Sequence, residues 1–421
     1  MRFSRPLFIA TIALLAALAG LSSLSAQAQK QGTHKARYTI RDLGTLGGSD
    51  VAAGGNSNAG WVTGYSLLPG DDVTHSFLWR NGALTDLGTL GGPNSFGNYR
   101  PNDFGDAGGY SDLSIADPNQ EDFCGFGTQL VCLAYFWHHG AMHALPTLGG
   151  SNSAGFGVND LGDLAGSAEN AIQEPTCVGT GQVLQYKPVI WRQGRIHELP
   201  TLGSDPVGGI YAINDLGEAI GQTGPCLGEA FGGSDHAVLW KNGNAIDLGS
   251  LGGTANNTPQ DLNILGQVVG YSNISGDATF HAFLWQRGKM TDLGTLPGDV
   301  HSVAEGINIR GEVVGRSSDA DFNGRGWIWQ NGVMTDLNTL IPASSPMYIL
   351  EGTSNNDLGQ IVGIGMTSSG DQHAFLATPV GNGGESATIA EALDTVQRPA
   401  IALSANLRRM PGRRGKRFGS Q

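Results

Sequence analysis

Carboxylates gather in three stretches of this sequence, at 110–132, 167–185 and 222–235. Such groups bind cations, accept hydrogen bonds from sugars, or act as acids and bases. We predict that these stretches contact a ligand through Asp117, Glu121, Asp122, Glu174 and Glu229. A glycosidase needs two carboxylates about 5 to 10 Å apart, and sequence does not fix such a distance. Hydrolysis of an extracellular polysaccharide is therefore an alternative to plain binding.

A fourth stretch, "SSDADFNGRG" at 317–326, resembles the first half of a calcium loop. Asp319, Asp321 and Asn323 place side-chain oxygens on alternate residues, which allows them to converge on one ion. The later carboxylate of such a loop is missing, because its place is held by Trp327 or Gln330. An acidic surface turn is the favoured interpretation. Apart from this calcium site, no cofactor is expected.

The first 28 residues have the pattern of a secretory signal peptide. Two arginines precede the apolar stretch 7–21, and an Ala-x-Ala site ends at Ala28. We expect the mature chain to begin at Gln29 and to be exported to the periplasm or the cell exterior. No later apolar run reaches the roughly 18 to 20 residues that a membrane helix needs.

All four cysteines lie in the three acidic insertions. An even number of cysteines in an exported chain favours disulfides. Of three possible pairings we predict Cys124–Cys132 and Cys177–Cys226, because the first pair shares one loop and the second lies in matching loops of adjacent repeats. A zinc site is disfavoured, since no C-x-x-C spacing occurs.

The insertions interrupt a repeat in which three motifs recur in fixed order. These are an N-x-x-G turn before an apolar strand, an apolar strand ending in W-x-x-G, and a D-L-G-T-L-like strand exit. Seven copies of the last motif lie 44 to 58 residues apart. N-x-x-G is typical of a type I turn, and W-x-x-G of a hairpin. Each unit therefore contains four strands, and the unbroken apolar runs predict burial of both faces.

The two ends of the repeat region favour a closed ring. The chain begins with the last strand of a unit (36–44), and the final unit, which ends at 373–377, lacks that strand. The N-terminal strand can complete the last sheet and remove its open edge. We therefore predict an all-β fold, a seven-bladed β-propeller of four-stranded blades over 36–380. An open solenoid or two packed sandwiches is the alternative.

Small residues predict which strand lies at the axis of the ring. They are abundant before N-x-x-G, as in 153–159 and 302–308, so this strand is expected to be innermost and the D-L-G strand outermost. This order puts the three insertions side by side on one face. Insertions confined to one sector of a repeat scaffold are typical of a binding site.

The motifs "HAFLW", "TDLGTL" and "INxxGxVVGxS" resemble those of the HAF repeat family of predicted extracellular proteins. The His-Ala-Phe tripeptide is intact at 281–283 and 373–375, and it changes to "HSF" at 75–77 and "HAV" at 236–238. The resemblance implies export and a repeat fold, and it transfers no catalytic residue. The repeated His and the repeated Asp of D-L-G are expected to be structural.

Charge divides the chain into an acidic body and a basic tail. Residues 29–380 carry a net charge of −19 and residues 381–421 a net charge of +4. The acidic body disfavours nucleic acid and anionic membranes as partners. In the tail, 386–397 predicts a short helix, and the basic segment 407–421 is expected to be solvated, with folding back onto the acidic body as an alternative.

Together these features predict a secreted, non-enzymatic monomer. It would bind an extracellular ligand, glycan or protein through the loop-bearing face of the propeller. The alternatives are a hydrolase or lyase that acts on polysaccharide, and a structural or adhesive surface protein.

Overall fold

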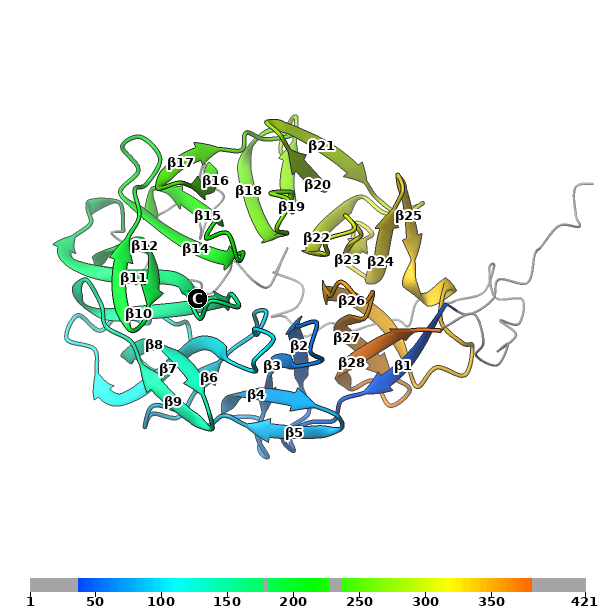
Figure 1. The fold of residues 1–421 in the computed structure, drawn as a ribbon, viewed down its shortest axis with the longest axis horizontal. Coiled ribbons are helices and arrows are strands. Elements are labelled where there is room, and N and C mark those ends of the chain that lie inside the picture. Colours follow the sequence, from blue (N-terminus) through cyan, green and yellow to red (C-terminus); the bar gives the residue numbers. More distant parts are fainter. Residues whose placement is uncertain (1–36, 178–180, 227–235, 381–421) are drawn as a thin grey trace, which may run out of the picture.

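The computed structural model describes residues 37–177, 181–226 and 236–380. They form seven antiparallel four-stranded sheets arranged around a central axis (Figure 1). This confirms the predicted seven-bladed β-propeller. Two short 3-10 helices, η1 (Pro175–Cys177) and η2 (Leu337–Thr339), lie in connections between strands.

Within blades 1 to 6 the strands follow chain order from the axis outward (Figure 1). Blades 1 to 3 contain β2 (Val51–Asn56), β3 (Val62–Leu67), β4 (Thr74–Arg80), β5 (Ala83–Asp86); β6 (Ser95–Phe96), β7 (Ala107–Ala116), β8 (Leu130–His138), β9 (Ala141–Ala144); β10 (Gly149–Val158), β11 (Leu164–Gln173), β12 (Leu184–Arg192) and β13 (Arg195–Glu198). Blades 4 to 6 contain β14 (Val207–Ile213), β15 (Ala219–Gly224), β16 (His236–Lys241), β17 (Asn244–Asp247); β18 (Gly252–Leu262), β19 (Val268–Ile274), β20 (Phe280–Gln286), β21 (Lys289–Gly294); β22 (His301–Ile307), β23 (Val313–Ser318), β24 (Gly324–Gln330) and β25 (Val333–Asp336).

Blade 7 joins the two ends of the propeller. It contains β26 (Met347–Asn355), β27 (Ile361–Thr367) and β28 (Gln372–Pro379), and β1 (Tyr38–Asp42) is its outermost strand. In the β1–β28 pair, Asp42 lies opposite Phe375. The Nδ1 atom of His373 lies 2.6 Å from the Oδ2 atom of Asp42, so a side-chain hydrogen bond also links these strands. The predicted closure of the ring is confirmed.

The second strand of each blade carries a glycine seven residues after the first position of N-x-x-G, where its backbone lies close to the innermost strand. In blades 4 and 6 this glycine lies beside a bulge in the innermost strand. A Cβ on Gly221 would collide with the carbonyl oxygen of Gly209, and one on Gly315 with that of Val303. The same collision arises in the other five blades, at Gly64, Gly109, Gly166, Gly270 and Gly363.

The first residue of each Asn turn holds its own loop. The Oδ1 atom of Asn214 accepts the N–H groups of Leu216 and Glu218, both at 3.0 Å, and Gly217 has a φ of 73° that suits glycine. This is the turn that the motif predicts. The same two bonds form at Asn102, Asn159, Asn263, Asn308 and Asn356.

The amide nitrogens of the same Asn residues join neighbouring blades, a role that the motif alone does not indicate. The Nδ2 atom of Asn159 donates to the backbone carbonyl of Asn214 at 3.1 Å. We call the set of such bonds the Asn ladder; its six links run from Asn102 to Asn159, Asn214, Asn263, Asn308, Asn356 and the carbonyl of Ser57. The seventh link is missing, because Ser57 replaces Asn in blade 1, and its buried Oγ atom has no hydrogen-bond partner.

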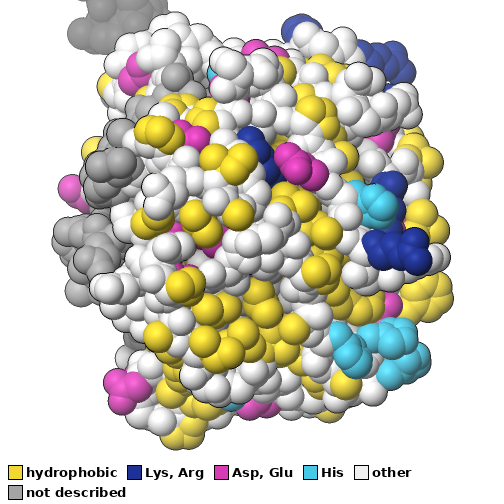
Figure 2. All heavy atoms as spheres, turned by 90° about the vertical axis from the view of Figure 1, so that its left-hand side faces the viewer, with side chains coloured by type: hydrophobic (Ala, Val, Ile, Leu, Met, Phe, Trp, Pro, Cys, Tyr) yellow, Lys and Arg dark blue, Asp and Glu magenta, His cyan; other side chains and the backbone are white. Residues whose placement is uncertain are grey.

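The apolar core is divided among the interfaces between blades. One cluster, for example, joins Ile220 and Leu239 of blade 4 to Val268 and Phe283 of blade 5. Each blade buries its faces against its neighbours. The outer side of the ring therefore does not have to form part of the apolar core. On the side shown in Figure 2, acidic side chains are scattered singly among apolar and neutral ones.

Completing the Asn ladder should stabilise the protein. We expect Ser57→Asn to raise the free energy of unfolding by about 1 kcal/mol, since it adds one buried hydrogen bond and satisfies the turn. Urea denaturation of the full chain measures this, with Ser57→Ala as the control that removes the unpartnered hydroxyl and adds no donor. A Ser57→Asn variant no more stable than Ser57→Ala would contradict the expectation.

Candidate functional site

The three insertions connect the second and third strands of blades 2, 3 and 4. They lie on the face opposite to the N-x-x-G turns, as the strand order requires. We call this the insertion face, and the face that carries the N-x-x-G turns the turn face.

Two of the predicted binding residues, Asp117 and Glu121, are buried within the insertions. An Oε1 atom of Glu121, which is 0 % exposed, accepts the N–H group of Leu184 in the next insertion at 2.8 Å. The carboxylate of Asp117 accepts N–H groups from Asn119 and Glu121, and the side-chain amide of Asn152. Both carboxylates therefore hold the loops together.

The other predicted binding residues that the structure describes also accept hydrogen bonds within their own loops. The carboxylate of Asp122 accepts the N–H group of Gly127, and that of Glu174 accepts the N–H and hydroxyl groups of Thr176. Glu229 lies outside the described residues. Because the four described carboxylates already accept hydrogen bonds from the protein, the structure shows no ligand site at them, and their contact with a ligand stays a prediction.

Both disulfides form as predicted. Cys124 pairs with Cys132 within the first insertion, and Cys177 pairs with Cys226 between the second and third. Disulfides indicate a non-reducing compartment. Within residues 37–177, 181–226 and 236–380, no helix is long and apolar enough to cross a membrane.

A buried acid near Glu121 titrates close to neutral pH. Burial, and then the negative charge of Glu121, raises the pKa of Glu169 to about 7. Hydrogen bonds from Gln182 and from the side chain and backbone of Asn152 oppose this rise. Because Glu169 is 0 % exposed, it cannot exchange protons with a bound ligand at the surface, and its titration affects folding stability instead.

The predicted calcium loop is an Asp-capped turn. The Oδ1 atom of Asp319 accepts the N–H groups of Asp321 and Asn323, both at 3.0 Å, and its Oδ2 atom accepts the Asn323 side-chain amide. In the part of the chain that the structure describes, no group of three or more His, Cys, Asp or Glu side chains is placed to hold a metal. Calcium binding here stays a prediction.

The repeated His and Asp residues hold strands together, as expected. His75 pairs with Asp86 at 2.9 Å, and His281 pairs with Asp292 at the same distance. Each of these pairs joins the third and fourth strands of one blade. The aspartates also accept a backbone N–H group two residues further on, so both residue types have structural partners.

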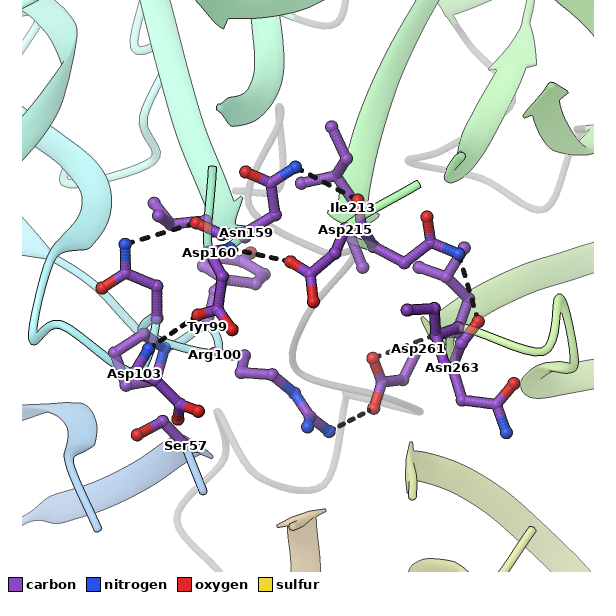
Figure 3. A pocket seen from close by; sticks show the side chains of 18 of the residues that line it. Ser57, Tyr99, Arg100, Asp103, Asn159, Asp160, Ile213, Asp215, Asp261 and Asn263 are labelled. Atoms are coloured by element: carbon purple, nitrogen blue, oxygen red, sulfur yellow. Dashed lines mark hydrogen bonds and ion pairs between the residues drawn. The ribbon is translucent and has the colours of Figure 1, made fainter. Parts of the chain in front are cut away.

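The turn face carries a cavity of about 210 Å³ at its centre (Figure 3). Its wall includes the second residues of the N-x-x-G turns. In blades 2, 3, 4 and 7 these residues are Asp103, Asp160, Asp215 and Asp357, in blades 5 and 6 Ile264 and Ile309, and in blade 1 Asn58. Both oxygens of Asp357 already have donors, the N–H group of Ile309 and the side-chain amide of Asn58. We call the three aspartates of the consecutive blades 2, 3 and 4 the rim carboxylates, and their side of the cavity the acidic side.

One oxygen of each rim carboxylate accepts a backbone N–H group from a neighbouring blade. Asp103 accepts the N–H group of Ala59 at 2.9 Å, Asp160 accepts that of Asp103 at 2.8 Å, and Asp215 accepts that of Asp160 at 2.8 Å (Figure 3). Among the described residues, the second oxygen of each has no hydrogen-bond donor. Three neighbouring oxygens thus remain for a ligand.

Among the described residues, no Lys or Arg forms a salt bridge with a rim carboxylate, although the charge of Arg100 acts to lower the pKa of Asp160. Arg100 reaches across the channel, where its guanidinium donates to Asp261 of blade 5 at 2.9 Å (Figure 3). That bridge already pairs the arginine of the cavity. Partial burial and the carboxylates of Asp215 and Asp103 raise the pKa of Asp160, which is the sign expected where like charges gather.

Ser57 supplies one further polar group. It lines the cavity and is 3 % exposed, and its Oγ atom is the unpartnered hydroxyl left by the gap in the Asn ladder. Buried polar groups normally have hydrogen-bond partners. Because the Oγ atom is itself buried, it marks the gap in the Asn ladder and offers no direct contact to a ligand in the cavity.

Exposed apolar residues surround the cavity on the same face. They occupy the second and third places of the N-x-x-G turns, and we call them the apolar rim: Phe104, Leu161, Leu216, Ile264, Leu265, Ile309 and Leu358. Their exposed fractions run from 38 % to 74 %. Apolar exposure that is concentrated on one face is typical of an interaction surface.

Our sequence analysis predicted a site on the insertion face and did not single out the turn face. A signal was present in the N-x-x-G copies. The turn itself needs Asn and Gly, yet blades 2, 3, 4 and 7 add Asp followed by Phe or Leu at the two free places. The turn geometry does not require those residue types.

No family model and no curated protein matches the chain. Similar solved structures include a puromycin-hydrolysing peptidase from Mycobacterium tuberculosis (TM-score 0.47, 11 % identity, 82 % of this chain and 56 % of that chain). A gluconolactonase from Xanthomonas campestris has a TM-score of 0.36 and 10 % identity, over 84 % of this chain and 99 % of that chain. A sialidase from Trypanosoma rangeli has a TM-score of 0.36 and 11 % identity, over 75 % of this chain and 59 % of that chain. The chain spans just over half the length of the peptidase. At these identities and scores, none of the three bears on what this chain binds.

The two disulfides should differ in their effect on stability. Replacing Cys177 and Cys226 with Ala should lower the free energy of unfolding by about 4 kcal/mol, against about 2.5 kcal/mol for Cys124 and Cys132, because the longer loop loses more entropy on closure. The separations are 49 and 8 residues. Urea denaturation of the two double variants measures the difference. A larger loss from the short loop would contradict the loop-length explanation.

Stability should fall as pH rises through neutrality. The folded pKa of Glu169, about 7, exceeds the value of about 4.3 for an exposed Glu. Between these values the folded chain binds more protons than the unfolded chain, so the free energy of unfolding decreases with rising pH and levels off above about 7. We expect a loss on the order of 2 kcal/mol between pH 5 and 8, measured by urea denaturation.

Glu121→Gln tests the cause of this pH dependence. Removing the neighbouring charge should lower the pKa of Glu169 and flatten the curve between pH 5 and 8. The exposed Glu198 provides the matched control, since Glu198→Gln removes the same charge on the outer strand β13. Equal slopes in both variants would show that Glu121 does not act on Glu169.

Proposed function

We propose that this protein is a secreted, non-catalytic propeller that binds a cationic and partly apolar ligand through its turn face. One observation carries the proposal: the three rim carboxylates face Ile264 and Ile309 across one cavity, and each has an oxygen without a donor. A positive group of the ligand pairs with the carboxylates, and its apolar parts cover the apolar rim.

The size and chemistry of the cavity favour a peptide or protein segment as the ligand. A volume of about 210 Å³ admits one large side chain, while the apolar rim offers contacts outside the cavity. Arginine suits the acidic side best, because its planar guanidinium donates to several carboxylates at once. The proposed ligand therefore carries Arg next to apolar residues.

Export is the second part of the proposal. It is supported by the signal-like pattern of residues 1–28, the two disulfides, and the resemblance of the motifs to HAF repeats. The protein acts as a monomer whose turn face is open to extracellular or periplasmic partners.

Hydrolysis of polysaccharide is a second candidate function, and one observation favours it. Asp160, whose pKa is raised, lies between two carboxylates in an open cavity. Acid–base cleavage of a glycosidic bond uses two carboxyl groups of different pKa, and a raised pKa favours the role of the acid. Release of reducing sugar by the full chain, lost in Asp160→Asn, would support this function over binding alone.

Calorimetry with a short peptide tests the binding function. We expect acetyl-Leu-Arg-Leu-amide to bind the full chain, and its citrulline analogue, which lacks the charge, to bind at least about tenfold more weakly. The double variant Asp160→Asn, Asp215→Asn should bind the arginine peptide about tenfold more weakly, since each lost charge removes part of the attraction. Asn preserves the fold at this place, because Asn58 already accepts the N–H group of Asp357 in the same way.

A matched pair of changes controls for net charge. Asp72→Asn with Glu198→Gln removes two exposed charges away from the cavity and should leave affinity unchanged. Equal binding of the arginine and citrulline peptides would refute the proposed function.

A further inference from the structure

We infer that residues 400–421 of the same chain dock on the turn face and place a basic side chain in the cavity. This inference rests on the proposed function, because the site is the same and its occupant is now named. The described structure supplies the surface, and the sequence supplies a segment whose chemistry matches it.

The chain leaves the propeller on the turn face. Its last described strand, β28, ends at Pro379, and a Cβ on Gly359 would lie 3.4 Å from the Cγ atom of that proline. Gly359 closes the N-x-x-G turn of blade 7. The next residue, Val380, donates its N–H group to the carbonyl of Arg37 at 2.8 Å. Residues after Val380 therefore start beside the turns that surround the cavity.

The connecting segment is long enough to reach the cavity. Nineteen residues, 381–399, separate Val380 from the proposed docking segment. The helix predicted for 386–397 would span about 18 Å at 1.5 Å per residue, and each of the seven other residues adds up to about 3.3 Å. Two strand spacings of about 4.8 Å separate β28 from the innermost strand of its blade. The axis of the ring is thus within easy reach without any change in the propeller.

The segment and the site are complementary in charge and in apolar character. Residues 408–417 contain six Lys or Arg residues, and 400–421 contain no Asp or Glu. Ile401, Leu407 and Phe418 flank this basic run. Positive charge therefore faces the rim carboxylates, and the flanking apolar residues have the apolar rim to cover.

The cations already at this face do not satisfy the rim carboxylates. Arg100 pairs with Asp261, and Arg310 pairs with Glu312. A guanidinium in the cavity would donate to the oxygens of the rim carboxylates that have no donor among the described residues.

The tethered segment has an advantage over other occupants. Its attachment keeps it near the site at an effective concentration in the millimolar range, so it competes with free ligands of moderate affinity. A second copy docked face to face would bring two sets of rim carboxylates together, which like-charge repulsion opposes. An external ligand therefore binds only if its affinity and concentration allow it to displace the docked segment.

Photo-crosslinking in the full chain tests the docking. We expect Phe104→p-benzoylphenylalanine, at a place 74 % exposed on the apolar rim, to crosslink to residues 400–421 of its own molecule, as peptide mass spectrometry would show. The matched control is Ile115→p-benzoylphenylalanine, 60 % exposed at the insertion face. We expect it to give at least tenfold less of this product. Equal yields from the two places would overturn the inference.

Isotope mixing tests whether the docking is intramolecular. An equal mixture of ¹⁵N-labelled and unlabelled chains should give crosslinks within labelled or within unlabelled molecules, and mixed products would overturn the same-chain assignment. High salt should lower the yield, because exposed charges are screened.

Neutralising the rim tests the chemistry of the docking. Asp103→Asn, Asp160→Asn and Asp215→Asn together should lower the crosslink yield at least tenfold. Each Asn keeps a side-chain oxygen that can accept the same backbone N–H group. The charge-matched control is Asp72→Asn, Glu198→Gln and Asp371→Asn, all exposed and away from the cavity, which should keep the yield. Circular dichroism and melting would confirm that both variants are folded. An unchanged yield in the rim variant would overturn the inference.

A variant of the tail separates this inference from the proposed function. Replacing the six basic residues of 408–417 with Gln in the full chain should strengthen binding of acetyl-Leu-Arg-Leu-amide by about tenfold, because the internal competitor is lost. If the peptide binds both chains equally and the tail does not crosslink, the docking is wrong and the proposed function stands. If the tail crosslinks and the peptide binds neither chain, the docking stands and the proposed function is wrong.

Discussion

The Asn ladder is the constraint on which the rest of this propeller depends. One buried side chain performs two tasks at each turn: its oxygen holds the local backbone, and its nitrogen fixes the distance to the next blade. Because the first residue of the turn points into the protein, the second and third residues are left at the surface. Position in the turn thus decides which residues support the ring and which can meet a ligand.

The two faces of the ring use carboxylates in opposite ways. On the insertion face, long loops bury acids such as Glu121 and Glu169 to organise their own backbone, and two disulfides reinforce them. On the turn face, the very short loops bury the first residue of each turn, while Asp103, Asp160 and Asp215 each keep one oxygen without a donor among the described residues. A long loop has the means to enclose its own charges, so acidic composition alone does not show which carboxylates are exposed.

Features that depend on local geometry or on repeat order were predictable from sequence. The missing strand of the last unit matched 36–44, and matching loops paired Cys177 with Cys226. Contacts between side chains far apart in sequence were not predictable. The burial of Glu121 depends on the backbone of Leu184, 63 residues away, and the free oxygen of Asp160 depends on which neighbours approach it in the ring.

The ring itself provides the comparison that separates structural need from function. At the second place of the turn, blade 1 has Asn58, blade 7 has Asp357, and blades 5 and 6 have Ile264 and Ile309, so the fold tolerates neutral and charged side chains there. Burial, and then the carboxylates of Asp215 and Asp103, raise the pKa of Asp160, so gathering three carboxylates has an electrostatic cost. Asn would make the same backbone bond without that cost. Since the fold does not require the charge, its concentration on three consecutive blades is best explained by a ligand that requires it.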